Sequence, residues 1–514
     1  MGSFHIENFG CRAARADGEA IADRLLHAGC SVQQPFDADL VVVNTCSVTA
    51  EADRAARAMI RRVHRRNPAA RIVVTGCYAQ RAPEELAAMQ GVTAVVGNSH
   101  KALAPEILLG LLTDGGKPAG AQSGFVSLGA LQTAGNAPVW ADESFAHSFL
   151  EEAQLTPGAQ TRPNLKVQEG CSNRCSFCVI PQTRGGNRSL AAEAVLKQVR
   201  GFVAAGGREL VLSGINLGRW SASHGSPGAA HGSPAARIMD NAESAATSFA
   251  APGVAHEAVS GAADGGLSSG SSSPQPRNLA ALVRTIFAET ELPRLRLSSI
   301  EPMDWDRELL AVLAEFAAPS IASPRLARHA HLPLQSGSDA VLRRMFRRYR
   351  PWHYEQKVEA LFKAAGEDLT LGADVMVGFP GETEAEFQET VSMIRRLPFA
   401  YLHLFPFSPR PNTPAQALHA AHPVPPAIVQ ERMDALRALA AEKGSAHRSR
   451  FLGRTMDAIT LHTPPELTAR NKTSALTENF LPVELEGSFA ANHLLRIEVL
   501  AVEEALLARP LTIL

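Results

Sequence analysis

The chain has 514 residues, of which 45% are hydrophobic and 20% are charged, and its formal net charge is −1. A chain of this length can form two to four domains, and the composition is that of an ordinary soluble protein. The balanced charge excludes a globally basic nucleic-acid binder, so any contact with nucleic acid must come from local clusters.

All seven cysteines lie in the first third of the chain. The first residues show no charged region followed by an apolar one, and no apolar run is long enough to cross a bilayer. We therefore expect a cytoplasmic protein without a membrane partner. In that compartment, clustered thiols serve metal binding or catalysis rather than disulfide formation.

The first predicted domain, residues 1–150, contains apolar runs that each end in a cysteine. These runs are at 4–11, 39–46 and 71–77, with helical patterns at 13–28 and 50–66 between them. The order predicts a parallel sheet, and ligands gather beyond the carboxyl ends of such strands. We therefore predict a three-thiolate metal site of Cys11, Cys46 and Cys77. The alternative for each is a buried core cysteine, the role we assign to Cys30.

The predicted helix at 50–66 carries a basic stripe. Its arginines are Arg54, Arg57, Arg61 and Arg65, with Arg62 and Arg66 beside them. Spacings of three and four residues place the first four on one helical face, where they can contact RNA phosphates. A solvated surface helix explains the stripe equally well. A short apolar helix at 102–112 and a linker reaching residue 160 follow.

The second predicted domain, residues 161–445, opens with a strand that leads into Cys171, Cys175 and Cys178. Thiolates are soft ligands suited to zinc or to iron–sulfur clusters. A structural zinc site needs a fourth ligand, and none follows nearby. A 4Fe-4S cluster held by three thiolates instead leaves one iron open to a further ligand, which favours a reactive centre.

The rest of this domain alternates between strand-like and helix-like runs. Strands are expected at 164–168, 208–213, 294–300, 328–335, 370–377 and 400–406, and helices at 190–205, 277–290, 306–316, 352–365 and 383–396. Six β/α units predict a partial barrel with its chemistry at the carboxyl ends of the strands. An insertion at 221–276, rich in Gly, Ser, Ala and Pro, is expected to be disordered.

Several of these strand ends carry polar or glycine-rich groups suited to a nucleoside and an amino acid. With aromatic Phe177 in the cysteine loop, the candidate cofactor contacts are Ser213, Gly214, Glu301, Gln335, Ser336 and Asp374. The glycines would serve equally well as plain turns. A second arginine cluster faces either RNA or a bound carboxylate, or is a solvated helix end: Arg343, Arg344, Arg347, Arg348 and Arg350.

The last predicted domain, residues 446–514, has alternating β-type runs at 455–462, 480–486 and 494–502. They predict a small antiparallel β-barrel. Such barrels often bind RNA through an exposed face, and the alternative is an appendage that only stabilises the protein.

The cysteine loop resembles the signature of the radical S-adenosylmethionine (SAM) enzymes, and the whole chain outside the insertion resembles the tRNA methylthiotransferases. Within that family it is similar to the branch that modifies N6-threonylcarbamoyladenosine at position 37 of tRNA. The motifs that carry this resemblance are at 44–49, 75–80, 168–171, 298–302, 403–408 and 477–483.

The resemblance implies an α/β protein with an N-terminal domain, a radical SAM partial (β/α)6 barrel and a C-terminal TRAM domain. It implies two 4Fe-4S clusters, one on Cys171, Cys175 and Cys178 and one on Cys11, Cys46 and Cys77. The first cluster, when reduced, would cleave SAM to a 5'-deoxyadenosyl radical. The radical would take hydrogen from C2 of the modified adenine. A sulfur associated with the cluster on Cys11, Cys46 and Cys77 would then join C2, and its methyl would come from a second SAM. Implied partners are the tRNA anticodon loop, an external electron donor such as flavodoxin or ferredoxin, and a sulfur donor.

Two positions depart from the family pattern. Ala14 stands where an asparagine is usual, and Leu190 stands where an arginine is usual. The alternative functions are the same chemistry on isopentenyl-type adenosine in tRNA or on an aspartate of a ribosomal protein. A more distant alternative is a non-catalytic iron–sulfur protein that binds RNA or transfers electrons.

Overall fold

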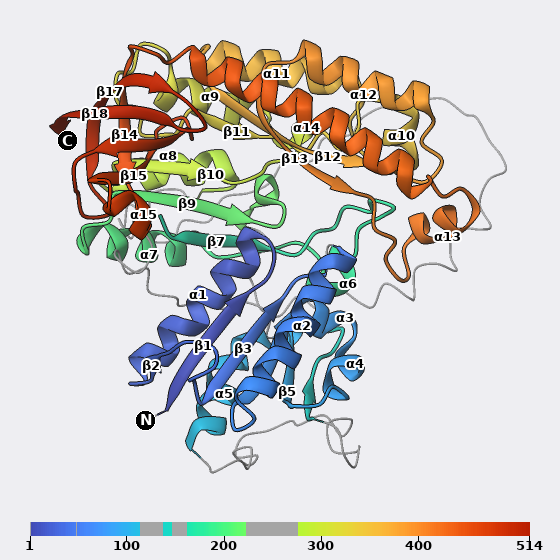
Figure 1. Cartoon of the computed structure of the whole chain (residues 1–514). Helices are drawn as coiled ribbons and strands as arrows, with labels where there is room; N and C mark the ends of the chain where they lie inside the picture. Colours follow the sequence, from blue (N-terminus) through green and yellow to red (C-terminus); the bar gives the residue numbers. More distant parts are fainter. Residues whose placement is uncertain (1, 48, 114–136, 146–161, 223–275) are drawn as a thin grey trace, which may run out of the picture. The chain divides into compact units, whose positions relative to one another are not determined.

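The computed structural model describes residues 2–47, 49–113, 137–145, 162–222 and 276–514. These residues belong to one compact unit (Figure 1). Most of the predicted linker before residue 160, and residues 223–275 of the predicted insertion, lie outside the described residues. Among the described residues, no helix combines the length and the apolarity needed to span a membrane.

The N-terminal region is a six-stranded parallel sheet in the order β2-β1-β3-β4-β5-β6. Its strands are β1 (Ser3–Asn8), β2 (Ser31–Val32), β3 (Leu40–Thr45), β4 (Arg71–Gly76), β5 (Val92–Gly97) and β6 (Val139–Trp140). Its helices are α1 (Arg12–His27), α2 (Ala50–Arg66), α3 (Cys77–Arg81), α4 (Pro83–Ala87) and α5 (Ala104–Thr113), the last preceded by the 3-10 helix η1 (Asn98–Leu103).

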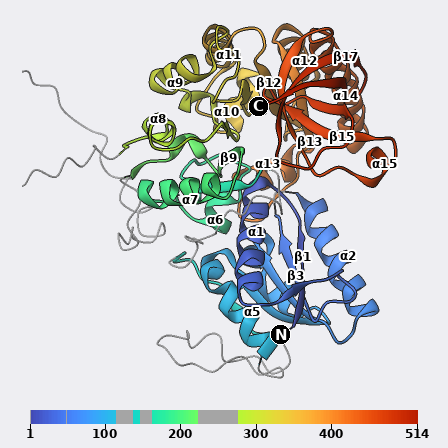
Figure 2. The same cartoon turned by 90° about the vertical axis from the view of Figure 1, so that its left-hand side faces the viewer.

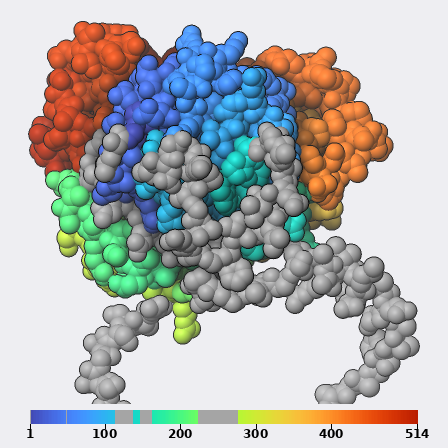
Figure 3. Space-filling model, turned by 90° about the horizontal axis from the view of Figure 1, so that it is seen from below, coloured from blue at the N-terminus to red at the C-terminus, as the bar shows by residue number. Residues whose placement is uncertain are grey.

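Helices cover both faces of this sheet, with α1 and α5 on one side and α2 on the other (Figure 2). Strand β3 shows why: Val41 and Val43 belong to the core beneath α2, whereas Leu40 and Val42 belong to the core beneath α1 and α5. A strand buried on both faces has to be apolar throughout. The outer surface of this region is drawn in blue in Figure 3.

The second region is the predicted partial barrel. Its six parallel strands are β7 (Asn164–Glu169), β9 (Glu209–Gly214), β10 (Arg294–Leu297), β11 (His329–His331), β12 (Thr370–Val377) and β13 (Phe399–Pro406), and the short antiparallel β8 (Arg188–Ser189) borders β7. The strands form two groups, β8-β7-β9-β10 and β11-β12-β13, which an isolated parallel bridge between Leu295 and Leu326 connects.

Helices surround these strands and share one hydrophobic core with them. They are α6 (Ile180–Arg184), α7 (Ala192–Ala204), α8 (Leu279–Glu289), α9 (Arg307–Ala317), α10 (Asp339–Arg344), α11 (Pro351–Ala365), α12 (Glu384–Arg396), α13 (Pro414–Ala421) and α14 (Pro426–Ser449), with the 3-10 helices η3 (Leu217–Arg219) and η6 (Pro302–Asp304). The sequence patterns did not predict α6, α10, α13 and α14, and the predicted domain boundary at residue 446 falls inside α14. Charged Arg432 and the polar His447 are both buried on α14, which obscures its apolar periodicity.

The C-terminal region is a closed five-stranded barrel in the order β14-β15-β16-β18-β17. Its elements are β14 (Thr455–Thr460), α15 (Pro465–Thr468), β15 (Lys472–Thr477), β16 (Pro482–Glu486), β17 (Leu494–Val502) and β18 (Leu506–Ile513). The predicted fold class is thus confirmed, although the sequence analysis lacks β15 and β18. Pro510 weakens the strand signal of β18, where it sits at an irregularity opposite Ile497.

Candidate active site

The first cysteine site is the loop that follows β7. Cys171, Cys175 and Cys178 are all partly exposed, and Gly170 turns the chain into the loop with a φ of +70°. Cys171 Sγ accepts hydrogen bonds from the Asn173 amide at 3.4 Å and from Asn216 Nδ2 at 3.7 Å. N–H donors aimed at sulfur stabilise thiolates and tune a metal that the thiolates bind.

Arg347, which follows α10, contacts this loop and was not distinguished by its sequence from the other arginines of its cluster. Its Nη1 donates to Cys175 Sγ at 3.3 Å, and its Nη2 donates to Glu301 at 2.5 Å. In the sequence it is one of five neighbouring arginines, so nothing local distinguishes it. The fold does, because Arg347 is buried, whereas Arg343 pairs with Asp339 on the surface.

The chemistry of this thiol set fits a bound cluster. Burial raises the pKa of Cys178 to about 12, and burial also raises the pKa of Cys171. Such thiols become thiolates at neutral pH only beside a strong positive charge, which a metal centre supplies. In the described residues, neither cysteine set brings three ligand atoms within 4.8 Å of one another, as one tetrahedral zinc ion would require.

The second cysteine site lies at the carboxyl edge of the N-terminal sheet. Cys46 directly follows β3, Cys77 directly follows β4, and Cys11 lies three residues beyond β1. The turn that carries Cys11 packs against Cys46, because a Cβ added at Gly10 would lie 2.5 Å from Cys46 Cβ. Gly10 also has a φ of +114°, a conformation that favours glycine. The three strands thus bring the three predicted cysteines to one edge.

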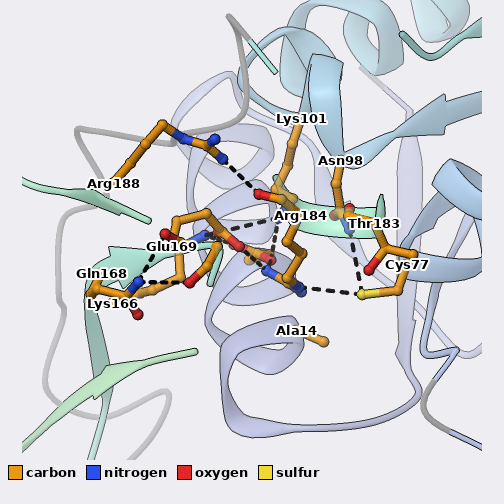
Figure 4. A network of polar contacts seen from close by, with 12 residues as sticks. Ala14, Cys77, Asn98, Lys101, Lys166, Gln168, Glu169, Thr183, Arg184 and Arg188 are labelled. Carbon is orange, nitrogen blue, oxygen red and sulfur yellow. Dashed lines mark hydrogen bonds and ion pairs between the residues drawn. The ribbon is translucent and has the colours of Figure 1, made fainter. Parts of the chain in front are cut away.

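Cys77 receives two hydrogen bonds from buried side chains (Figure 4). Arg184 Nε donates to Cys77 Sγ at 3.3 Å, and Asn98 Nδ2 donates to the same sulfur at 3.4 Å and to the Thr183 carbonyl at 2.9 Å. Thr183 and Arg184 belong to α6, only a few residues beyond Cys178. The segment that follows the first site therefore contacts the second.

Arg184 belongs to a buried charge network between α1, β7, η1 and α6. Its Nη1 contacts Glu169 at 2.6 Å and Asp17 at 3.2 Å, Lys101 contacts Asp17 at 2.5 Å, and Lys166 contacts both carboxylates. Three cations and two carboxylates leave one positive charge. A thiolate at Cys77 would balance that charge, which is the state a metal ligand must have.

Comparison with known proteins agrees with this arrangement. Residues 3–97 match the uncharacterized protein family UPF0004, and residues 237–394 match the radical SAM superfamily. A threonylcarbamoyladenosine tRNA methylthiotransferase MtaB from Aquifex aeolicus is 30% identical over 96% of this chain and 98% of its own length. The chain belongs to the radical SAM tRNA methylthiotransferase family. The family resemblance seen in the sequence is therefore confirmed.

Other relatives extend the comparison. MtaB from Bacillus subtilis is 30% identical over 95% of this chain and 91% of its own length. A tRNA-2-methylthio-N(6)-dimethylallyladenosine synthase from Sorangium cellulosum is 34% identical over 89% of this chain and 82% of its own length. The solved radical SAM methyltransferase TsrM from Kitasatospora setae has a TM-score of 0.52 at 14% identity, covering 80% of this chain and 76% of TsrM, and shows a shared fold.

Membership of the radical SAM superfamily implies a 4Fe-4S cluster and SAM. Of the residues predicted to contact SAM, two have buried polar atoms without a hydrogen-bond partner among the described residues, and a third shares its partner with Cys175. Ser213 Oγ and Gln335 Oε1 are buried without a hydrogen-bond partner, and Gln335 has a φ of +61°. Glu301 Oε2 accepts from Arg347 beside Cys175. Their contact with SAM stays a prediction.

The other predicted SAM contacts have structural partners. The Phe177 ring stands edge-on to Phe379, with the centroids 6.4 Å apart, and Ser336 Oγ contacts Thr390 Oγ1 at 3.1 Å. Gly214 allows close packing, because an added Cβ would lie 2.8 Å from Gln168 Oε1.

Asp374 lies between two imidazoles on adjacent strands. Its Oδ1 is 3.4 Å from His331 Nε2 and 3.2 Å from His403 Nδ1. Hydrogen bonds to these histidines outweigh burial and lower the pKa of Asp374. The carboxylate is thus ionised and held inside the barrel.

Both departures from the family pattern lie among the described residues. Leu190 is buried in the core of the radical SAM region, where its carbonyl accepts from Trp220 Nε1 at 3.0 Å. Ala14 lies on α1 in the neighbourhood of Cys77 and Arg184 (Figure 4), and its carbonyl accepts from Asn44 Nδ2 at 2.6 Å. Arg184 Nη2 is buried without a hydrogen-bond partner.

The predicted basic stripe does form one surface on α2. Arg57, Arg61, His64 and Arg65 line a surface pocket of about 750 Å³ together with Glu85, Met89 and Gln90. Arg57 is held by Tyr78 at 2.5 Å and contacts Glu85 at 3.4 Å. RNA contact by the stripe stays a prediction.

Proposed function

We propose that this enzyme adds a methylthio group to C2 of N6-threonylcarbamoyladenosine at position 37 of tRNA. The observation that carries the proposal is the pair of three-cysteine sites, which Arg184 and the α6 segment connect through Cys77. The substrate rests on the relatives named MtaB, which match nearly the whole chain.

Each part of the chain has a role in this proposal. Cys171, Cys175 and Cys178 would hold a 4Fe-4S cluster with one open iron, and Arg347 would donate its hydrogen bond to the cluster ligand Cys175. When bound, this cluster and SAM supply the 5'-deoxyadenosyl radical that removes hydrogen from an unactivated C–H bond. Cys11, Cys46 and Cys77 would hold the second 4Fe-4S cluster, beside which the sulfur is delivered.

The C-terminal barrel would act as a TRAM domain that binds the anticodon-loop region of tRNA, and the basic stripe on α2 would contact phosphates. An external one-electron donor, such as flavodoxin or ferredoxin, and a sulfur donor would complete the reaction in the cytoplasm. A non-catalytic iron–sulfur protein remains the distant alternative, and it would leave SAM intact.

The test is a nucleoside digest of bulk tRNA from cells with and without this gene, analysed by mass spectrometry. The methylthio form of N6-threonylcarbamoyladenosine should disappear on deletion. It should return with the intact gene but not with a gene encoding Cys175→Ala.

A second candidate substrate is dimethylallyladenosine, because the relative from Sorangium cellulosum is named for it and is 34% identical. Loss of the methylthio form of that nucleoside, with the threonylcarbamoyl form unchanged, would refute the proposed substrate and support this one. Loss of a ribosomal-protein modification alone would refute both.

A further inference from the structure

A group of arginines surrounds the ring of Phe480, and the charge of one of them is not paired. Arg12 is the first residue of α1 and directly follows Cys11. Its guanidinium carbon lies 5.6 Å from the centre of the Phe480 ring. Within the described part of the chain, no carboxylate lies within ion-pair distance of Arg12.

Two further arginines complete the Phe480 cluster, which we define as Arg12, Arg162, Arg296 and Phe480. The guanidinium carbons of Arg296 and Arg162 lie 5.2 and 6.0 Å from the same ring centre. Both arginines share a single carboxylate, Glu209, at 3.1 and 3.7 Å. Three cations against one shared anion leave an excess of two positive charges at the cluster.

One N–H donor of Arg296 has no acceptor among the described residues. Its Nε donates to Glu209, and its Nη2 donates to the carbonyls of Thr477 and Glu478 at 3.3 and 3.2 Å. Its Nη1 is fully buried and has no hydrogen-bond partner among the residues that the structure describes. A buried, unpartnered guanidinium N–H costs free energy unless a ligand accepts its hydrogen bond.

The neighbouring groups do not neutralise the cluster. The His329 ring is tilted by 35° against the Phe480 ring, with the centroids 4.4 Å apart. Burial together with the nearby arginines lowers the pKa of His329, so it is neutral. Burial also lowers the pKa of Arg162 to about 10. Tyr401 lies beside Phe480, and the carboxylate of Asp374 beyond it contacts His331 and His403 instead of the arginines of the cluster.

A ligand can reach the cluster from solvent, because Arg12, Arg162 and Phe480 are each partly exposed. The cluster is also close in sequence to the second cysteine site, since Arg12 is adjacent to Cys11. Guanidinium groups bind carboxylates in a bidentate geometry, and a partly desolvated site strengthens that interaction.

We propose that the Phe480 cluster is a carboxylate receptor that selects the anionic threonyl group of the substrate base over a neutral substituent such as dimethylallyl. This inference rests on the proposed function and assigns its substrate selectivity. In this proposal the carboxylate would accept hydrogen bonds from the unpaired guanidinium of Arg12 and from Nη1 of Arg296. A tRNA backbone phosphate offers the same chemistry, so the experiment has to separate the two anions.

The experiment measures binding of reconstituted wild-type enzyme to two preparations of one tRNA, which carry threonylcarbamoyladenosine or plain adenosine at position 37. We expect the wild type to prefer the modified tRNA by about 10- to 100-fold, the range of a hydrogen-bonded charge pair. Arg12→Gln should abolish this preference without weakening binding of the plain tRNA. Arg12→Lys should retain part of it.

Arg15→Gln is the matched control, because Arg15 lies on the same helix with a 64% exposed side chain and only a 3.7 Å contact with Glu19. It should keep the full preference. Thermal melting of each variant confirms that it is folded. If Arg12→Gln does not fold, the tRNA preference of Arg12→Lys decides the test.

Three results would contradict the proposal that the Phe480 cluster is a carboxylate receptor. Equal weakening of both tRNAs by Arg12→Gln, with a shallower dependence of affinity on salt, would show a phosphate contact instead. An unchanged preference in Arg12→Gln would show that the cluster binds no substrate carboxylate. A wild type without preference, yet active on threonylcarbamoyladenosine, would refute the receptor alone. Failure of the proposed function is distinct, since the wild type would then not methylthiolate that base at all.

Discussion

The two cysteine sites are built in opposite ways. The site of Cys171, Cys175 and Cys178 is one loop of eight residues after a single strand, and its cysteines are partly exposed. The site of Cys11, Cys46 and Cys77 draws one cysteine from each of three strands, and a buried network of charges stands behind it. The cysteines of the first site are brought together by their close spacing in the sequence. Those of the second site are brought together because parallel strands end at the same edge of the sheet.

This difference predicts different failures. Damage to the cysteines of the loop site should stop SAM chemistry and leave the fold intact, because all three cysteines are partly exposed and none belongs to the hydrophobic core. Damage at the strand-end site should reach the fold itself, because Arg184 and its partners pack α6 against the N-terminal sheet.

The largest expected effect separates the two sites by chemistry. Cys175→Ala should abolish reductive cleavage of SAM to 5'-deoxyadenosine, because the cluster would lose one of three ligands. Cys77→Ala should keep that cleavage and still lose methylthio product. Both readouts come from one anaerobic assay analysed by liquid chromatography. SAM cleavage by Cys175→Ala would refute the assignment of the loop site.

The next effect is on stability at the strand-end site. Arg184→Met removes a fully buried cation from Asp17 and Glu169, which should lower the free energy of unfolding by about 3–5 kcal/mol. Chemical denaturation measures this change. Arg284→Gln is the control, because its pair with Glu315 is exposed, and its loss should cost at most about 1 kcal/mol. Similar losses in the two variants would contradict the comparison.

A smaller effect is expected at the loop site. Arg347→Gln removes the charged donor to Cys175 Sγ, so the rate of SAM cleavage should fall by about 10- to 100-fold. A shift in the reduction potential of the bound cluster should accompany the loss of rate. Arg343→Gln, four residues earlier and 61% exposed, should leave both unchanged. A rate loss without a change in potential would indicate a merely structural role.

The smallest effect is a pH dependence confined to the strand-end site. Burial lowers the pKa of Lys101 to about 8, from 10.5 when exposed. Between these values the unfolded chain binds the proton and the folded chain does not, so stability from this group rises with pH. The melting temperature of the wild type minus that of Lys101→Met should therefore grow from pH 8 to pH 10. A constant difference would contradict the shift.

The sequence predicted the elements that carry strong periodicity or clear motifs. The helix predicted at 50–66 is α2 with the same bounds. The side chains of Leu40, Val41 and Val42 point to opposite faces of the sheet in turn, and because both faces are buried, these residues form a continuous apolar run in the sequence. The convergence of the three strand-end cysteines follows from topology alone. Such features depend only on local patterns and on the rules of parallel sheets.

Residues that act through long-range contacts could not be found in this way. Arg184 and Cys77 are 107 positions apart, and Arg347 and Cys175 are 172 apart. Before folding, neither arginine differs from its neighbours. The same holds for Phe480. In the sequence it is the first residue of a predicted strand, whereas in the structure three arginines lie within 6.0 Å of its ring centre.

Helix α6 connects the two cysteine sites. It spans only Ile180–Arg184, about 7 Å of helix, between the last cysteine of one site and the arginine that contacts the other. One extra residue in this helix would turn Arg184 by about 100° and move its guanidinium away from Cys77. The length of α6 therefore determines how the segment after Cys178 meets Cys77, and an insertion there would break this connection while leaving every cysteine in place.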